Sequence, residues 1–210
     1  MRKIVLLCLV LVLVTGCSSG IMHSDMTRAI TPDNEEYPDR ESYIKITGLD
    51  KNPEKPVAVI TAIPFTGEIK HATGSLIPTV DKKGYLELCV AKALKEVIPN
   101  VAVYFDVKPD TIAIYKIERV FTGSDGLLIR RSKLTSGISS WFVEIYGNLA
   151  MNNKTMELNG VGAKPGMART GDMHYCTWNA CLDVANQIAD VLVKEGYLRE
   201  DQIRKAKVEK

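Results

Sequence analysis

Two stretches of the chain carry apolar residues at helical spacing. In Leu86–Ile98 and again in Trp178–Leu192, apolar residues recur at intervals of three and four. This spacing places them on one face of an amphipathic helix. Pro99 stops the first helix, whereas the second is expected to begin after Thr177 as its N-cap and to end at Gly196.

Alternating apolar and polar positions predict the strands. The expected strands are Val57–Ile63, Val101–Val107, Thr111–Phe121, Leu127–Leu134, Trp141–Met151 and Thr155–Ala163. Turn residues follow the third and fifth of these strands, so each is expected to form a hairpin with the next strand. The order of elements predicts an α+β fold: a mostly antiparallel sheet of about five to six strands, with two amphipathic helices packed on one face.

The N-terminus has the pattern of a secretory signal. Arg2 and Lys3 precede an unbroken apolar run, Ile4–Val14. As a helix this run would be about 16 Å long at roughly 1.5 Å per residue, too short to cross a hydrocarbon core of about 30 Å. It is therefore typical of the apolar region of a signal peptide.

The apolar run ends in Val14-Thr15-Gly16-Cys17. This tetrapeptide resembles the lipobox of bacterial prolipoproteins. The resemblance implies cleavage after Gly16, a diacylglycerol thioether on Cys17, and the membrane as a partner through that lipid. Ser18 follows, where an Asp would favour inner-membrane retention, so the resemblance implies the periplasmic face of the outer membrane. A plain cleaved signal or an uncleaved anchor is the alternative.

These patterns divide the chain into four segments. Residues 1–16 are expected to be the signal peptide, and residues 17–56 a lipidated N-terminus followed by a flexible tether, because this stretch is polar and holds several prolines. Within it, Tyr43–Thr47 alternates weakly and is expected to form a short edge strand. Residues 57–198 form the predicted α+β periplasmic domain, and residues 199–210 a charged tail with one loose helical turn.

The charge balance argues against a nucleic-acid partner. The chain has 27 Lys and Arg against 25 Asp and Glu, and Arg2 and Lys3 account for that difference. The segment after Gly16 is therefore neutral, which gives no electrostatic reason to bind nucleic acid. With 46% apolar residues the chain has enough material for a core.

Three cysteines remain beyond the lipidation site. Cys89 and Cys181 fall on the apolar faces of the two predicted helices, where they could form a disulfide or simply fill the core as small apolar residues. His174, Cys176 and Cys181 have ligand types suited to a metal or a redox site. The cluster lacks a second pair of ligands, so it is a weak metal candidate.

Catalytic and cofactor motifs are not evident in the sequence. It contains neither a phosphate-binding glycine loop nor a GxSxG nucleophile elbow. We therefore predict no catalytic residues and no cofactor. A compact basic cluster, Arg130, Arg131 and Lys133, is expected to be a solvated strand end.

The order of elements over Val57–Tyr197 resembles that of small periplasmic lipoproteins of the YajG type and, more loosely, auxiliary lipoproteins of outer-membrane transport systems. The resemblance implies a fold and a compartment but no activity. The function favoured is that of a non-catalytic interaction or accessory module for an envelope protein. The alternatives are a carrier of a small apolar ligand such as lipid, and a Cys/His metal or redox protein.

Overall fold

The computed structural model describes residues 39–67, 69–71, 84–123, 140–165, 170–206 and 208. Cys17, the predicted signal peptide, the predicted strand Leu127–Leu134 and the basic cluster at Arg130 lie outside these residues. The bounds that follow cover the described part of the chain.

The described elements form a mixed sheet with helices. The helices are α3 (Arg40–Thr47), α4 (Leu86–Val97) and α5 (Thr170–Lys194), and a 3₁₀ turn spans Glu200–Gln202. The strands are β1 (Ala58–Ile63), β2 (Ile69–His71), β3 (Val101–Tyr104), β4 (Ala113–Gly123), β5 (Ser140–Met151) and β6 (Lys154–Pro165). The strand order is β3-β1-β4-β5-β6, and β2 pairs with β4 beyond the end of β1.

Two long antiparallel ladders dominate the sheet. β5 pairs with β4 and with β6, and Asn152 and Asn153 make the β5–β6 turn with positive φ angles of 51° and 59°, as a two-residue hairpin turn requires. The α+β prediction is confirmed. The sheet also has a parallel part, in which β1 pairs with both β3 and β4. Helix α4 lies between β1 and β3 in the chain and makes the crossover that brings β3 back parallel to β1.

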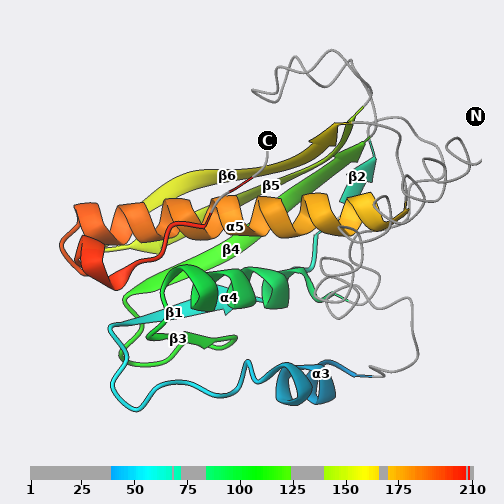
Figure 1. The fold of residues 1–210 in the computed structure, drawn as a ribbon. Coiled ribbons are helices and arrows are strands. Elements are labelled where there is room, and N and C mark those ends of the chain that lie inside the picture. Colours follow the sequence, from blue (N-terminus) through cyan, green and yellow to red (C-terminus); the bar gives the residue numbers. More distant parts are fainter. Residues whose placement is uncertain are drawn as a thin grey trace, which may run out of the picture.

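Helices α4 and α5 lie together on one face of the sheet (Figure 1). Their apolar stripes are buried against β1, β3, β5 and β6, as the predicted spacing required. Helix α5 begins at Thr170, so the prediction of Thr177 as its N-cap is wrong; Thr177 is buried inside the helix. No helix in the described ranges is both long and apolar enough to span a membrane.

Helix α5 rests directly on the backbone of β6. A Cβ at Gly162 would overlap the Cys176 carbonyl oxygen and lie 2.6 Å from the Ala180 nitrogen. A Cβ at Gly160 would lie 2.5 Å from a methyl group of Val184. The two glycines therefore let one stripe of α5 approach the strand more closely than any side chain would allow.

The segment before β1 is folded, which corrects two predictions. Residues 40–47 form a helix rather than an edge strand, because Asp39 accepts a 2.7 Å hydrogen bond from the Ser42 N–H and Gly48 ends the helix at φ 68°. Tyr43 is fully buried and stacks on Tyr85 at 5.0 Å. The flexible-tether prediction is therefore wrong for residues 39–56.

The C-terminal tail is docked rather than loose. After the 3₁₀ turn, the Arg204 N–H donates to the Val97 carbonyl at 2.7 Å. The Asn186 amide bonds both to the carbonyl and to the N–H of Ala206, at 3.0 and 3.2 Å. The tail therefore joins the C-terminal end of α4 to α5.

Candidate functional site: the outer face of the sheet

Strands β4, β5 and β6 have a second face that points away from the helices. Within the described ranges, no helix or strand covers it (Figure 1). The strand registers align its side chains in rows. These rows are Phe142 with Ala163, Phe121 with Glu144 and Val161, Arg119 with Tyr146 and Asn159, and Lys116 with Asn148 and Glu157. We call this set of residues the outer face.

The outer face changes character along the strands. Phe142 and Ala163 are buried at one end and pack with the half-buried Phe121 and Val161. Charged and amide side chains occupy the other end. The accessible part of the outer face is therefore its charged and amide end, bordered by the half-buried Phe121 and Val161.

A β-bulge shapes the polar end of the outer face. The register between β4 and β5 shifts between Ile117 and Arg119. As a result two consecutive side chains, Glu118 and Arg119, are both exposed, while the residues on either side are buried. Bulges of this kind redirect side chains and are frequent next to functional sites.

Arg119 is held by aromatic rings. Its guanidinium carbon lies 4.4 Å from the centroid of the Tyr146 ring and 6.0 Å from that of Phe121. The Tyr146 and Phe121 rings meet edge to face at 5.7 Å. One terminal nitrogen of Arg119 lies 3.2 Å from a carboxylate oxygen of Glu157, yet 53% of the side chain stays exposed. The guanidinium is therefore pre-positioned while part of the side chain stays accessible to solvent.

Beside this stack, a carboxylate is buried in the face. Glu144 is 2% exposed, and one of its oxygens accepts a 3.0 Å hydrogen bond from the Tyr146 hydroxyl. Burial, and then the nearby Glu144 carboxylate, raise the pKa of Tyr146. Tyr146 therefore stays a protonated donor across the physiological pH range, which fixes the ring under Arg119.

These side chains surround a surface hollow of about 270 Å³. It is lined by Glu118, Arg119, Tyr146, Gly147, Asn148 and Glu157. Position 147 has no room for a side chain, because a Cβ there would lie 2.5 Å from Tyr115 Cζ in the core. The hollow offers a guanidinium, an amide and two carboxylates, a set that can make charge-assisted hydrogen bonds to a polar partner.

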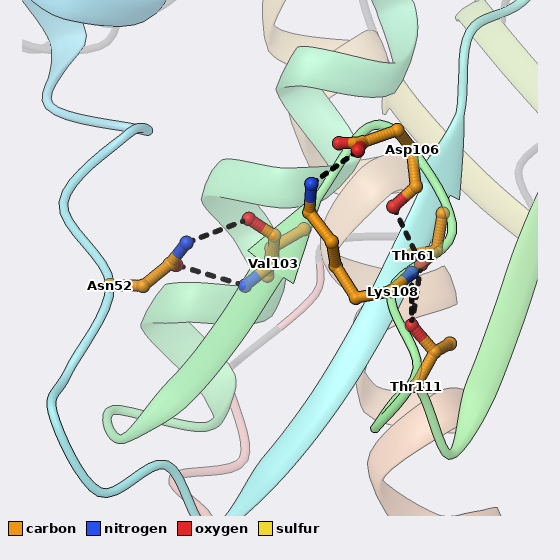
Figure 2. Close-up of polar contacts among 6 residues, drawn as sticks. All are labelled: Asn52, Thr61, Val103, Asp106, Lys108 and Thr111. Carbon is orange, nitrogen blue, oxygen red and sulfur yellow. Dashed lines mark hydrogen bonds and ion pairs between the residues drawn. The ribbon is translucent and has the colours of Figure 1, made fainter.

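A second polar cluster, at the carboxyl end of β1, has a structural role. Thr61 contacts the Thr111 hydroxyl at 3.0 Å and donates to the Asp106 carbonyl at 3.3 Å. The Lys108 N–H donates to Thr111 at 3.1 Å, and the Lys108 ammonium pairs with the Asp106 carboxylate (Figure 2). These bonds fix the loop between β3 and β4 and so set where β4 begins.

The predicted cysteine and histidine sites do not assemble. Cys89, Cys176 and Cys181 are buried and none forms a disulfide, so the Cys89–Cys181 bridge that the sequence allowed as one possibility is not formed. Both residues lie in the apolar core cluster, where a thiol packs as a small apolar side chain. The sequence also allowed this outcome, in which Cys89 and Cys181 fill the core as small apolar residues instead of forming a disulfide.

His174, Cys176 and Cys181 all lie within α5. Cys176 and Cys181 point about 140° apart around a regular helix, and His174 lies roughly 10 Å from Cys181 along its axis. No group of three such side chains in the described ranges is placed to hold a metal. A lipid pocket between α5 and β6 is also disfavoured, because the glycine contacts bring the two backbones together.

The residues of the outer face were not recognised from the sequence. The available signal was the break in alternation at Ile117-Glu118-Arg119-Val120, where two charged residues stand between two apolar ones. Such a break indicates a bulge in a predicted strand. The basic cluster at Arg130, which the sequence did single out, lies outside the described residues.

Comparison with known proteins leaves function open. No protein-family profile matches the chain, and no curated protein matches it. Among solved structures, an uncharacterised protein is similar at a TM-score of 0.41 and 9% identity over 70% of this chain and 97% of its own. A DUF330 protein from Xanthomonas campestris has a TM-score of 0.41 and 12% identity, over 69% and 90%.

A candidate lipoprotein from Caulobacter crescentus is similar at a TM-score of 0.32 and 7% identity, covering 61% of this chain and 88% of its own. Likenesses at this level carry no argument about activity. The class defined by the described residues is an α+β protein with helices on one face of a mixed sheet and a cluster of polar and aromatic side chains on the other.

Proposed function

We propose that this chain is a lipid-anchored envelope lipoprotein that acts as a non-catalytic interaction module. It is held through Cys17 on the periplasmic face of the outer membrane and binds an envelope protein through the outer face of β4, β5 and β6. The observation that carries the interaction role is the exposed Arg119, stacked on Tyr146 at a bulge beside a hollow.

The anchoring part of the proposal rests on the lipobox-like sequence and on the number of residues between Cys17 and the first described helix. Helix α3 starts at Arg40, so about 22 residues separate it from Cys17. Fully extended at about 3.3 Å each, these would reach roughly 70 Å. Two or more acyl chains on one residue give stable membrane attachment, whereas one chain gives only marginal attachment.

The binding part of the proposal rests on side-chain chemistry. Arg and Tyr are enriched among the residues that dominate binding energy at interfaces. Arg119 is ordered before binding by Tyr146 and Glu157, so little conformational entropy remains to be lost. The partner surface expected here presents a carboxylate to Arg119 next to apolar side chains for Phe121 and Val161.

We expect the Cys17→Ser variant to lose its lipid. Serine lacks the thiolate that accepts the diacylglycerol, so metabolic labelling with radioactive palmitate should mark the wild type and leave the variant unlabelled. The variant should also leave the membrane pellet on fractionation. A matched Cys8→Ser change, inside the predicted signal, should keep both properties. An unlabelled wild type would remove the anchoring proposal.

We expect a photo-cross-linking amino acid at Asn148 to form an adduct of defined mass in living cells. The same group at the exposed Glu195, beyond the end of α5, is the control and should form none. Adding Arg119→Ala should reduce the adduct about tenfold, because losing such an anchor commonly costs at least about 1.4 kcal/mol. An adduct that forms equally at both positions, or that ignores Arg119, would contradict binding at the outer face.

A further inference from the structure

Glu144 is an acidic residue in an otherwise apolar row of the outer face. It stands opposite Phe121 of β4 on one side and Val161 of β6 on the other, and both of these side chains are half-buried. Glu144 itself is 2% exposed and is not among the residues that line the hollow. A partner seated at the hollow would therefore not contact the Glu144 side chain.

Packing alone does not account for a carboxylate at this position. Burying a carboxylate costs free energy because the group loses its water, and only hydrogen bonds and opposite charges offset that cost. In the next row, Phe142 and Ala163 are buried without it. The Tyr146 hydroxyl donates to a Glu144 oxygen at 3.0 Å. This bond gives Glu144 a role that an apolar residue at the same place could not fill.

The bond fixes the far end of the Tyr146 ring. Glu144 and Tyr146 are two residues apart in β5, so their side chains lie on the same side of the sheet. The Phe121 ring packs edge to face on the Tyr146 ring, with the centroids 5.7 Å apart. Because a tyrosine side chain turns about only two bonds, a hydroxyl held by a buried acceptor fixes the plane of the ring.

The plane of the Tyr146 ring in turn places Arg119. The guanidinium carbon lies 4.4 Å from the ring centroid, and a cation is attracted to the face of an aromatic ring. With the ring turned away, Arg119 would keep the Phe121 ring at 6.0 Å and the ion pair with Glu157. Both members of that pair are more than half exposed, so it would hold the guanidinium only weakly. The contacts thus run from Glu144 through Tyr146 to Arg119.

We propose that Glu144 is a positioning residue for binding at the outer face: it holds the Tyr146 ring in the plane on which Arg119 stacks, and so sets the affinity for a partner that it does not touch. The effect on affinity rests on the proposed function, whereas the positioning of Arg119 is a property of the chain without its partner. When the bond to Tyr146 is lost, Arg119 must be ordered at the moment of binding, which costs free energy.

The first measurement needs no partner. In an NMR spectrum of the full-length chain in detergent, the Arg119 Nε–H signal, identified by its loss in Arg119→Lys, should lie upfield because the group sits over an aromatic ring. In Tyr146→Phe, which keeps the ring and loses the hydroxyl, the signal should move toward that of the exposed Arg204. Tyr197→Phe is the matched control: its hydroxyl bonds to Asn152 at 2.6 Å, so its loss should leave the Arg119 signal in place.

The second measurement uses the adduct formed by the photo-cross-linking group at position 148. Tyr146→Phe and Glu144→Ala should each lower the adduct yield about fivefold, which corresponds to about 1 kcal/mol for ordering one side chain on binding. Glu144→Gln keeps a hydrogen-bond acceptor and should restore most of the yield. Since Glu144 acts through Tyr146, adding Glu144→Ala to Tyr146→Phe should lower the yield no further.

The two measurements separate this inference from the proposed function. A wild type that forms no adduct would overturn the proposed function and with it the effect on affinity, but an Arg119 signal that moves in Tyr146→Phe would still support the positioning. An Arg119 signal that stays in place in Tyr146→Phe would overturn the inference, as would a double variant with a lower yield than Tyr146→Phe alone. Tyr146→Phe leaves Glu144 intact, so it carries the test if Glu144→Ala fails to fold.

Discussion

Replacing Gly162 with alanine is expected to lower the free energy of unfolding by about 3 kcal/mol, the upper end of the usual cost of overpacking a core. The new methyl group would overlap the Cys176 carbonyl oxygen and stand 2.9 Å from Asn179 Cβ. Most of these neighbours are helix backbone, which cannot rotate away as a side chain can. Helix α5 would have to move off β6 along its whole contact.

Urea unfolding of the purified chain, followed by circular dichroism, measures this effect. In a chain of this size, a loss of about 3 kcal/mol also corresponds to a fall in Tm of roughly 6–12 °C. Gly84→Ala is the matched control: Gly84 has φ +70°, but nothing lies within 4 Å of a Cβ there, so only about 1 kcal/mol of backbone strain is expected. Equal losses at the two positions would contradict the close α5–β6 contact.

The long elements of the fold could be predicted because their side-chain patterns agree with their packing. The stripe on Leu86–Ile98 is the buried face of α4, and the alternation over β5 matches its two faces. The packing role of Gly160 and Gly162 could not be predicted, since nothing in a single sequence shows what lies opposite a glycine. Their role depends on the position of α5, which only the tertiary structure supplies.

Helix α3 could not be found by periodicity, because a helix of 8 residues is too short to show a stripe. Tyr43-Ile44-Lys45-Ile46 alternates like a strand, yet Asp39 and Gly48 bracket a helix, and these capping residues were the better guide. The parallel pairing of β1 was likewise missed: a short buried strand carries no mark of its partner's direction. The parallel direction of β1 and β3 follows from the crossover that α4 makes between them.

The outer face was missed for a related reason. Charged residues in a strand are ordinary on a solvent-exposed face, so Glu118, Arg119 and Glu157 carried no signal one by one. Their meaning comes from register: Arg119 stands opposite Tyr146, and Glu157 stands opposite Asn148 on the next strand. Cross-strand neighbours of this kind are separated by many residues in sequence and meet only when the ladders are known.

Helix α3 is attached through a buried ion pair. Glu87, 1% exposed, has one oxygen 2.9 Å from an Arg40 nitrogen, and its other oxygen accepts from the Phe65 N–H at 3.2 Å. Arg40 also lies 4.6 Å from the centroid of the Phe105 ring. Burial raises the pKa of Glu87, while the Phe65 N–H and Arg40 offset part of that rise.

We expect Arg40→Met to destabilise the fold by about 2 kcal/mol at neutral pH, less than for a fully buried pair because a third of Arg40 reaches solvent. Glu87 binds its proton more tightly in the folded state than in the unfolded state. Its contribution to stability is therefore fully present below its ordinary pKa and is lost as the pH rises through the higher folded value. Removing Arg40 should enlarge that loss of stability at neutral pH. In acid, the free energy of unfolding of the variant should therefore approach that of the wild type.

A double-mutant cycle with Glu87→Gln isolates this pair from the other carboxyl groups that titrate in the same range. Glutamine cannot ionise, so Arg40→Met should cost little when added to Glu87→Gln, and the difference between those two chains should not change with pH. The exposed pair Lys116–Glu118 is the control, and Lys116→Met should leave stability within about 0.5 kcal/mol of the wild type. If Arg40→Met costs the same in acid and at neutral pH, packing on Phe105 and not charge attaches α3. The ion pair would then have no part in holding α3 against the rest of the fold.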